Sequence, residues 1–329
     1  MDVLALTPWD DWSIFIQLCV NGVTLGSVYA LIALGYSMVY GILKMLNFAH
    51  GDVYMIGSFL GYFMLTSGLD GPMNLAVPIW LALTLVLLVA MLGAGLLGVA
   101  IERFAYRPLR NAPRIAPLIS ALGVSFFLQN SALLLFGANF RTYDAFTLDG
   151  GVLFTKGIFE AWGKDDAIAL NLPLLNMLVI GGAIVLMILL TLLVARTRLG
   201  KAMRATAFDR EAAAMMGINP DRVIMATFFI GSALAGAAGV MVGMLFGQVY
   251  HFMGFLAGLK GFTAAVVGGI GSIPGAMLGG LLIGMIEAFS TGYLPEGSKF
   301  QDFYVFILLI AVMLFRPTGL LGRADIAKV

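Results

Sequence analysis

Long apolar runs separated by short polar segments make up most of this chain of 329 residues. A helix that crosses a membrane needs about 20 predominantly apolar residues, so runs of this length predict transmembrane helices. Strands of a membrane barrel would instead alternate between apolar and polar residues over about 10 residues. The pattern predicts an all-α polytopic membrane protein in which residues 1–329 form a single transmembrane domain. We expect helices near 14–40, 46–67, 77–101, 115–136, 173–195, 223–247, 255–289 and 301–316.

The run at 255–289 is too long for one helix, and it contains GGIGSIPG at 268–275. Glycine and proline at this density favour a break, so we expect two helices or half-helices and a total of about eight to nine transmembrane helices. GILK at 41–44, followed by a polar break, is similar to GLK at 258–260. This similarity fits an internal repeat with broken or re-entrant helices near a substrate route.

The composition supports a membrane protein. Hydrophobic residues make up 60% of the chain and charged residues 11%, whereas soluble domains carry about 25% charged residues. The net charge of +1 gives no indication of a nucleic-acid partner. Cys19 is the sole cysteine, which excludes an intrachain disulfide and a cysteine-based metal site. We also expect no cleavable signal peptide, because the first 12 residues contain no basic residue.

Basic residues gather in the stretches 103–114, 196–222 and 316–328. Cytoplasmic segments of membrane proteins carry an excess of Lys and Arg, so we expect these stretches inside the cell. This places the N-terminus outside and the C-terminus inside, which requires an odd number of crossings. The remaining loops are expected outside, near 68–76, 137–172 and 290–300.

The external loop at 137–172 is the largest of these, and it contains five acidic residues together with Tyr143 and Trp162. We interpret it as a solvated connecting loop. The alternative is a docking surface for an extracytoplasmic protein.

The longest polar stretch is the basic loop 196–222, which has the features expected of a force-transmitting element. Its alanines favour a helix over 202–216, and Asp209 is placed to cap a final segment with Glu211 in its first turn. Gly217 suits a left-handed C-terminal position, and Pro220 prevents continuation. Met215 and Met216 are adaptable side chains suited to a moving contact. The alternative is a helical connector on the membrane surface.

A few polar residues interrupt the apolar segments. Burying ionisable groups in a membrane is costly unless they face protein or a water-filled path. Asn47, His50 and Tyr54 would share one face of a helix, and the sequence around Gly51 suggests the start of a half-helix whose N–H groups could meet a carboxylate. The alternative is an N-cap at the cytoplasmic edge. Candidate residues for a substrate path are Asn47, His50, Asp52, Tyr54, Lys260 and Thr263.

Lys260 and Glu287 flank the predicted break. Glycines spaced four apart, such as Gly22 and Gly26 or Gly280 and Gly284, predict close helix packing rather than chemistry. No arrangement of residues indicates catalysis or a metal site, and no GxxxxGK[ST] motif is present, so we expect no ATP hydrolysis by this chain.

Several stretches together resemble the LivH-type permeases of branched-chain amino-acid ABC importers. The spacing of Glu211, Ala212 and Ala213 to Gly217 is similar to the EAA–G coupling loop of ABC-importer permeases, although the Ile-x-Leu-Pro that often follows is absent. The other matching stretches are NGVTLGSVYALIALGYSMVYGILKMLNFAHGDVYMIGSF (21–59), IERFAYRPLR (101–110), ISALGVSFFLQN (119–130), GFTAAVVGGIGSIPGAMLGG (261–280) and RPTGLLGR (316–323).

The resemblance implies an inner-membrane permease subunit that imports leucine, isoleucine or valine by ATP-driven alternating access. It implies a second, similar permease, two cytoplasmic ATP-binding subunits and an extracytoplasmic binding protein as partners. No cofactor is expected in this chain, since the partners hydrolyse ATP. By the motif, coupling to the ATPase would rest on Glu211, Ala212, Ala213, Met215, Met216 and Gly217.

Three other functions stay open. The same architecture could import urea, short amides or other amino acids. An ion-coupled secondary transporter would work without ATPase partners, but it has only Asp52 and Glu287 as intramembrane acids. A polytopic enzyme is the least favoured reading.

Overall fold

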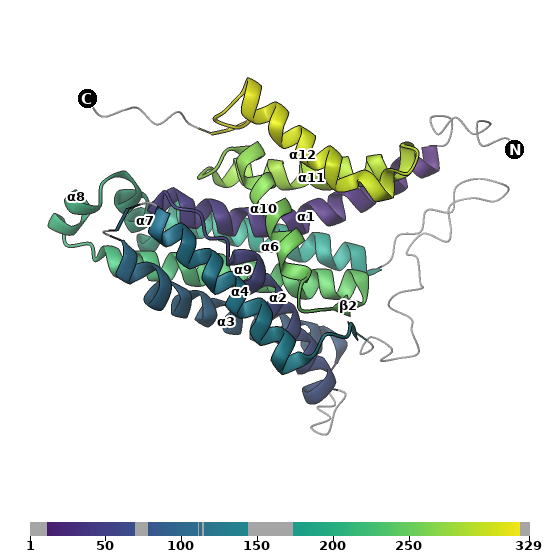
Figure 1. The fold of residues 1–329 in the computed structure, drawn as a ribbon, viewed down its shortest axis with the longest axis horizontal. Helices are drawn as coiled ribbons and strands as arrows, with labels where there is room; N and C mark the ends of the chain where they lie inside the picture. The colour runs from purple at the N-terminus through teal and green to yellow at the C-terminus, as the bar shows by residue number, and fades with distance from the viewer. Residues whose placement is uncertain (1–11, 70–77, 111, 114, 144–173, 323–329) are drawn as a thin grey trace, which may run out of the picture.

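The computed structural model describes residues 12–69, 78–110, 112–113, 115–143 and 174–322 (Figure 1). This part of the chain is a bundle of long helices with one small pair of strands. Most of the segment 137–172, predicted to be an external loop, lies outside the described residues. The helices are α1 (Trp12–Leu43), α2 (His50–Phe63), α3 (Ile79–Ile101), α4 (Ile115–Phe136), α6 (Leu174–Arg196), α7 (Arg198–Phe208), α8 (Arg210–Met215), α9 (Pro220–Phe246), α10 (Met253–Gly268), α11 (Ile273–Tyr293) and α12 (Gly297–Phe315).

Three short helical segments extend two of these helices. A π-helical segment, η1 (Met64–Leu69), continues α2. A second π-helical segment, η2 (Glu102–Tyr106), and a 3-10 turn, η3 (Arg107–Leu109), continue α3. Strands β1 (Arg141–Thr142) and β2 (Gln248–Val249) pair antiparallel, with Arg141 opposite Val249.

Seven helices in the described part of the chain are long and apolar enough to cross a membrane. Two further segments are shorter, since α10 has 16 residues and α2 has 14 before it passes into η1. The predicted break is confirmed between Gly268 and Ile273, where Gly269 and Gly271 adopt positive φ angles of 111° and 88° that favour glycine.

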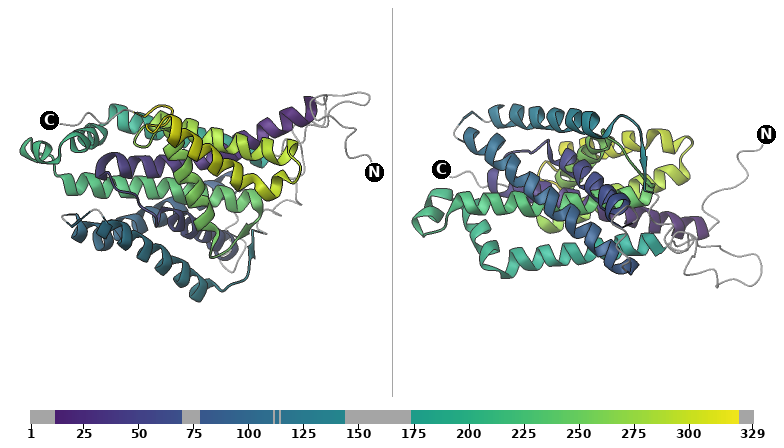
Figure 2. Two further views of the ribbon diagram at one scale, coloured as in Figure 1. Left: turned by 45° about the horizontal axis from the view of Figure 1, so that its top comes forward. Right: turned by 90° about the horizontal axis from the view of Figure 1, so that it is seen from below.

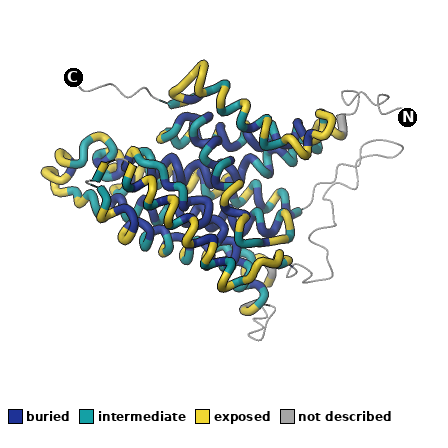
Figure 3. The backbone as a smooth tube through the Cα atoms, in the orientation of Figure 1, coloured by how far each residue is buried: buried dark blue, intermediate teal, exposed yellow. Residues whose placement is uncertain are grey.

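The core of the bundle forms around α1, α9 and α11, which have half or more of their spanning windows buried. In α6 the buried share is 22% and in α12 it is 6%, so these helices lie on the outside (Figure 3). Small residues explain the close contact of α1 with α11, because a Cβ added to Gly284 would lie 2.2 Å from the Gly26 nitrogen. The packing predicted from glycines four apart is therefore present at this interface.

Successive spanning segments run back and forth between the two ends of the bundle. These two ends differ in chemistry. Helices α7 and α8 project from one end, and α1 begins at the other (Figures 1 and 2). The guanidinium of Arg210 at the start of α8 donates to the carbonyls of Ile42 and Leu43 at the end of α1, over 3.1 and 3.3 Å. Arg107 and Arg110 form ion pairs with Asp221 at the start of α9. The predicted cytoplasmic basic stretches 103–114 and 196–222 thus meet at one end.

Candidate functional site

A cavity of about 420 Å³ opens between α1, α2, α9, α10, α11 and α12, at the end of the bundle opposite α8. Its α1 residues come from the first two-thirds of that helix, while the last residues of α1 contact Arg210. Its walls combine aliphatic, aromatic and polar side chains. The lining residues are Leu18, Asn21, Leu25, Val28, Tyr29, Tyr54, Val242, Phe246, Gln248, Tyr250, Met253, Leu256, Ala257, Lys260, Glu287, Ala288, Thr291 and Gln301.

An ionic cluster stands at the wall of this cavity. The Lys260 ammonium lies 2.5 Å from Glu287 Oε1 and 2.7 Å from Asp302 Oδ1. The Tyr29 hydroxyl donates to Glu287 Oε2 over 2.8 Å. These residues come from four helices, so the cluster joins α1, α10, α11 and α12. Charged groups within membrane helices are costly unless paired or in contact with water, and the ion pairs of this cluster meet the first condition.

Two of the predicted path residues, Tyr54 and Lys260, line the cavity. Asp52 lies instead at a separate cleft of about 30 Å³ between α1, α2, α4 and α10. Its carboxylate accepts a hydrogen bond from Gln129 Nε2 of α4 over 3.0 Å. Asp52 therefore joins two helices and stands apart from Lys260.

The other three predicted path residues are buried and are not among those that line the cavity. Asn47 precedes α2 and accepts a hydrogen bond from the Tyr106 hydroxyl over 3.1 Å, so it does not share a helical face with His50 and Tyr54. The ring of His50 packs edge-on against Tyr36, with centroids 4.7 Å apart. Thr263 lies on α10, three residues beyond Lys260, with 1% of its surface exposed.

The predicted coupling loop is helical over most of 202–216, and the cap predicted at Asp209 is confirmed, because the segment divides there into α7 and α8. Asp209 adopts an extended conformation, with φ −155°, and separates α7 from α8. Its side chain caps α8 by accepting from the Glu211 and Ala212 N–H groups over 3.0 and 3.1 Å. Capping by this carboxylate stabilises the start of α8, because it satisfies two N–H groups that have no partner within the helix.

The predicted end of α8 at Gly217 agrees with the geometry. Gly217 has a φ of 81°, and the Ile218 N–H donates to the Ala213 carbonyl over 3.1 Å. Pro220 does not only stop the preceding helix: it begins α9, where its missing N–H needs no partner.

Two apolar side chains on α8 face away from the bundle. Met215 and Met216 are 81% and 83% exposed, whereas Ala213 is buried against the rest of the chain. Arg210 ties the start of the helix to α1. Burial and the nearby positive charge of Arg110 lower the pKa of the Arg210 guanidinium, which stays charged at neutral pH. An exposed methionine pair on an anchored helix suits contact with another protein.

The family described as "Branched-chain amino acid transport system / permease component" matches residues 18–313. The chain belongs to this family. The resemblance to LivH-type permeases is thereby confirmed, and the chain is a multi-pass inner-membrane transport protein rather than an enzyme. A permease of an ABC importer works with ATP-binding and substrate-binding partners.

Relatives match this permease along almost its whole length. The high-affinity branched-chain amino acid transport system permease protein BraD of Pseudomonas aeruginosa is 45% identical over 96% of this chain and 98% of its own. LivH of Escherichia coli K12 is also 45% identical, with the same coverage. A probable LivH of Methanocaldococcus jannaschii is 27% identical over 90% of this chain and 89% of its own. No solved structure matches the permease.

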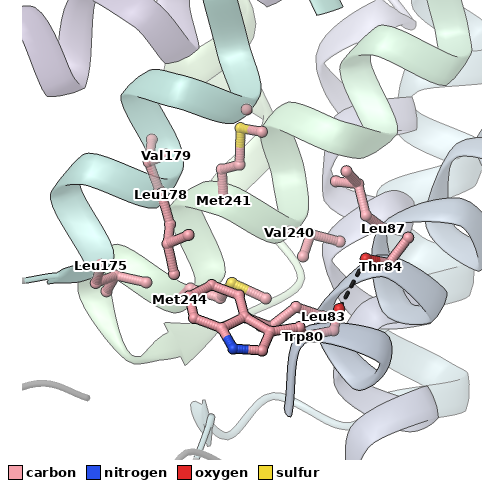
Figure 4. Close-up of a pocket in the computed structure, with 11 residues that line it drawn as sticks. Trp80, Leu83, Thr84, Leu87, Leu175, Leu178, Val179, Val240, Met241 and Met244 are labelled. Atoms are coloured by element: carbon pink, nitrogen blue, oxygen red, sulfur yellow. Dashed lines mark hydrogen bonds between the residues drawn. The ribbon is translucent and has the colours of Figure 1, made fainter. Parts of the chain in front are cut away.

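A second pocket in the permease, of about 260 Å³, lies between α3, α6 and α9 (Figure 4). Its walls are formed by Trp80 with leucine, valine and methionine side chains. The Thr84 hydroxyl is satisfied by the Trp80 carbonyl at 2.7 Å. None of the residues that line this pocket is charged, and the Trp80 indole N–H is its only other side-chain donor, so the pocket suits an apolar ligand and the first cavity suits a charged solute better.

Sequence reasoning about the permease missed several cavity residues. Tyr29 stands in an unbroken apolar run, where an aromatic residue is usually core. Asp302, which pairs with Lys260 but is not among the residues that line the cavity, stands near the start of a helix, where an acidic residue is common. Asn21 accepts a hydrogen bond from Gln17 Nε2 within α1 over 3.1 Å, and a polar residue satisfied inside its own helix gives no signal of a cavity. Among the cavity residues that were not proposed for the substrate path, only Glu287 gave a usable signal, its charge within an apolar run.

Proposed function

We propose that this chain is the membrane-spanning permease subunit of an ATP-driven importer for leucine, isoleucine and valine. The observation that carries the proposal is the cavity, whose lining combines aliphatic side chains with the ion pair of Lys260 and Glu287. An amino acid with an aliphatic side chain has this same combination of charged and apolar groups. The names of the relatives that are 45% identical support the same substrate class.

The substrate would arrive from an extracytoplasmic binding protein, on the side where the cavity opens. A second homologous permease would complete the membrane unit, and two cytoplasmic ATP-binding subunits would hydrolyse ATP. This chain would need no cofactor of its own.

We assign the contact with the ATP-binding subunits to α8 and its C-terminal turn. The exposed Met215 and Met216 would enter a groove on the partner, and Gly217 would fix their direction. Arg210 would pass the movement to α1, because its guanidinium donates to the last carbonyls of that helix. Since α1 also lines the cavity, ATP-driven movement could change access to the substrate. The remaining residues of this contact are Glu211, Ala212 and Ala213.

Uptake of radiolabelled leucine tests the proposal. Proteoliposomes would hold this chain, its co-purified partners, the binding protein and internal ATP, with valine, urea and glutamate as competitors. We expect ATP-dependent uptake that valine alone inhibits. Inhibition by urea or glutamate would assign a different substrate to the transporter. Uptake that does not depend on ATP but is abolished by an ionophore would favour an ion-coupled transporter.

A further inference from the structure

We propose that α7 and the cavity beside it bind an anionic phospholipid of the cytoplasmic leaflet. The lipid phosphate would lie on the basic face of α7. The first carbons of an acyl chain would enter the cavity between α1, α6, α7 and the turn that joins α10 to α11. This site goes beyond transport itself, since it includes neither the substrate cavity nor the exposed methionines of α8.

Four basic residues lie directly after a spanning helix. Arg196 ends α6, and Arg198, Lys201 and Arg204 lie on α7, which begins two residues later. We call these four residues the basic cluster. All four are exposed, and no acidic residue occurs between 196 and 208. Groups of about four to eight Lys and Arg directly cytoplasmic of a transmembrane helix are typical of sites that bind anionic lipids.

The basic residues of α7 share one face of the helix. Arg198, Lys201 and Arg204 are three positions apart, and residues at this spacing are neighbours on a helix surface. Met203 and Thr206, on the other side of α7, are buried against the bundle. A helix with one buried apolar side and one basic exposed side is typical of a membrane interface.

The positive charges of the basic cluster have no acidic partner in the described part of the chain. Arg107 and Arg110 at the same end of the bundle pair with Asp221, whereas no residue of the basic cluster forms an ion pair with a described residue. The Arg204 guanidinium donates to the Val194 carbonyl, and a guanidinium carries five N–H donors. A lipid phosphate would supply the missing negative charge.

A cavity of about 120 Å³ lies directly beside the basic cluster. Arg204 and Val194, whose contact joins α7 to α6, both belong to its lining. Ser37 is the one other polar residue among the described residues that line it. Its apolar walls come from the end of α1, from α7 and from the start of α11: Met38, Ile42, Met203, Ala207 and Ile273. A charged group next to an apolar cavity matches the junction of a phosphate headgroup with an acyl chain.

The position of α7 favours a lipid over the ATP-binding subunits as its partner. α7 begins where the spanning helix α6 ends, at the level of the headgroups, whereas α8 lies farther from the bundle (Figure 1). Topology alone requires basic residues at this end, but it does not require them to share one helix face beside a cavity. Arg103, Arg222 and Arg316 are exposed at the same end and do not line the cavity.

Native mass spectrometry of the assembled transporter measures lipid binding directly. The complex of this chain with its permease and ATP-binding partners would be delipidated in detergent and titrated with dioleoyl-phosphatidylglycerol. For the variant Arg198→Gln/Lys201→Gln/Arg204→Gln, we expect the half-saturating lipid concentration to rise at least about tenfold, because each basic residue at headgroup level adds to the attraction.

The matched control is Arg103→Gln/Arg222→Gln/Arg316→Gln, which removes the same number of positive charges from the same end. It should leave the half-saturating concentration near that of the unaltered transporter. An equal effect of both variants would overturn the proposal, since charge in general would then explain the binding. Dioleoyl-phosphatidylcholine that binds as tightly as phosphatidylglycerol would overturn it too. So would displacement of the lipid by excess inorganic phosphate, because the site would then recognise phosphate alone.

Gly41→Leu tests the cavity without a change of charge. A Cβ added to Gly41 would lie 3.7 Å from the Gly271 Cα, an ordinary contact, and both glycines line the cavity. The rest of the leucine side chain would then occupy the space proposed for the acyl chain. We expect the half-saturating concentration of phosphatidylglycerol to rise severalfold. Unchanged binding would refute the cavity as part of the site.

The same spectra show whether each variant assembles, because loss of a subunit changes the mass of the complex. If the triple variant on α7 lost the ATP-binding subunits but kept phosphatidylglycerol, α7 would belong to the contact with those subunits, and the lipid site would be wrong. If that variant did not assemble, Arg198→Gln/Lys201→Gln would decide, because it keeps the bond from Arg204 to the Val194 carbonyl. This double variant should still raise the half-saturating concentration severalfold.

Discussion

Gly35 on α1 faces the ring of His50 at the centre of the bundle. A Cβ added to Gly35 would lie 2.3 Å from His50 Nε2 and 2.9 Å from the Gly231 carbonyl oxygen, closer than atoms approach one another. The contact explains why His50 is buried, since the imidazole fills the space left by the missing side chain. His50 therefore has a packing role at the crossing of α1, α2 and α9.

We expect Gly35→Ala to destabilise the permease by about 1–3 kcal/mol, the usual cost of overpacking a dense core. Thermal unfolding of the purified complex in detergent would show a lower midpoint. Gly123→Ala is the control, because a Cβ at Gly123 has nothing within 4 Å, and alanine favours a helix. A midpoint equally lowered in both variants would contradict the role assigned to this contact.

At the residue scale, two signals found cavity residues: charge within an apolar run, and the polar helix face on which Tyr54 was placed. Lys260 was predicted from its charge, and Glu287 was noted. Asn47 and Thr263 were also chosen for their polarity, but polar groups of this kind are often satisfied within the core, as Asn47 is by Tyr106. The sequence does not state which polar groups share a cavity, because that depends on helix packing.

Gly217 ends α8 with a backbone angle that side chains disfavour. Its φ of 81° lies in the left-handed region, where a non-glycine residue costs about 1–2 kcal/mol. Gly217→Val should therefore loosen the turn that directs Met215 and Met216. We expect leucine uptake to fall severalfold while membrane insertion stays intact, as measured by uptake and by the amount of permease in the membrane.

Gly137→Val provides the matched control for this substitution. Gly137 has a similar φ of 85°, also has nothing within 4 Å of an added Cβ, and follows α4 at the opposite end of the bundle. It should leave ATP-driven uptake near normal. If both variants lost uptake equally, backbone strain in general, and not the geometry of α8, would be the cause.

At the element scale, breaks were predictable where glycine and proline cause them. The turn between α10 and α11 was found because GGIGSIPG combines both residues. The division between α7 and α8 was indicated by another signal, the cap predicted at Asp209, although the alanines on both sides favour a continuous helix. Helix propensity is summed over many residues, whereas one side-chain cap acts at one point.

The orientation of the whole molecule follows from its two chemically different ends. The basic stretches predicted to be cytoplasmic meet around α8, and the cavity lies at the other end. In a Cys19→Ser background, we expect Lys299→Cys to react with an impermeant maleimide in intact spheroplasts. Met216→Cys should react only after permeabilisation. The opposite pattern would invert the orientation and place the cavity on the cytoplasmic side.

At this scale the sequence predicted the spanning segments well, since apolar length and basic flanks are local properties. It did not predict which helices lie inside the bundle. α6 and α11 are both apolar, but α11 is buried because its glycines match those of α1. That matching involves residues more than 250 positions apart, and a hydropathy pattern contains no information about it.

The ionic cluster also affects how the chain enters the membrane during synthesis. α10 has only 16 residues, shorter than the usual span of about 20, and a central lysine adds about 2.5–3.5 kcal/mol to insertion. Its partners Glu287 and Asp302 leave the ribosome later. In a microsomal insertion assay, α10 alone should insert poorly, and a fragment from α10 to α12 should insert well. Stable residence of α10 in the bilayer would then be a late event, completed only when α12 arrives.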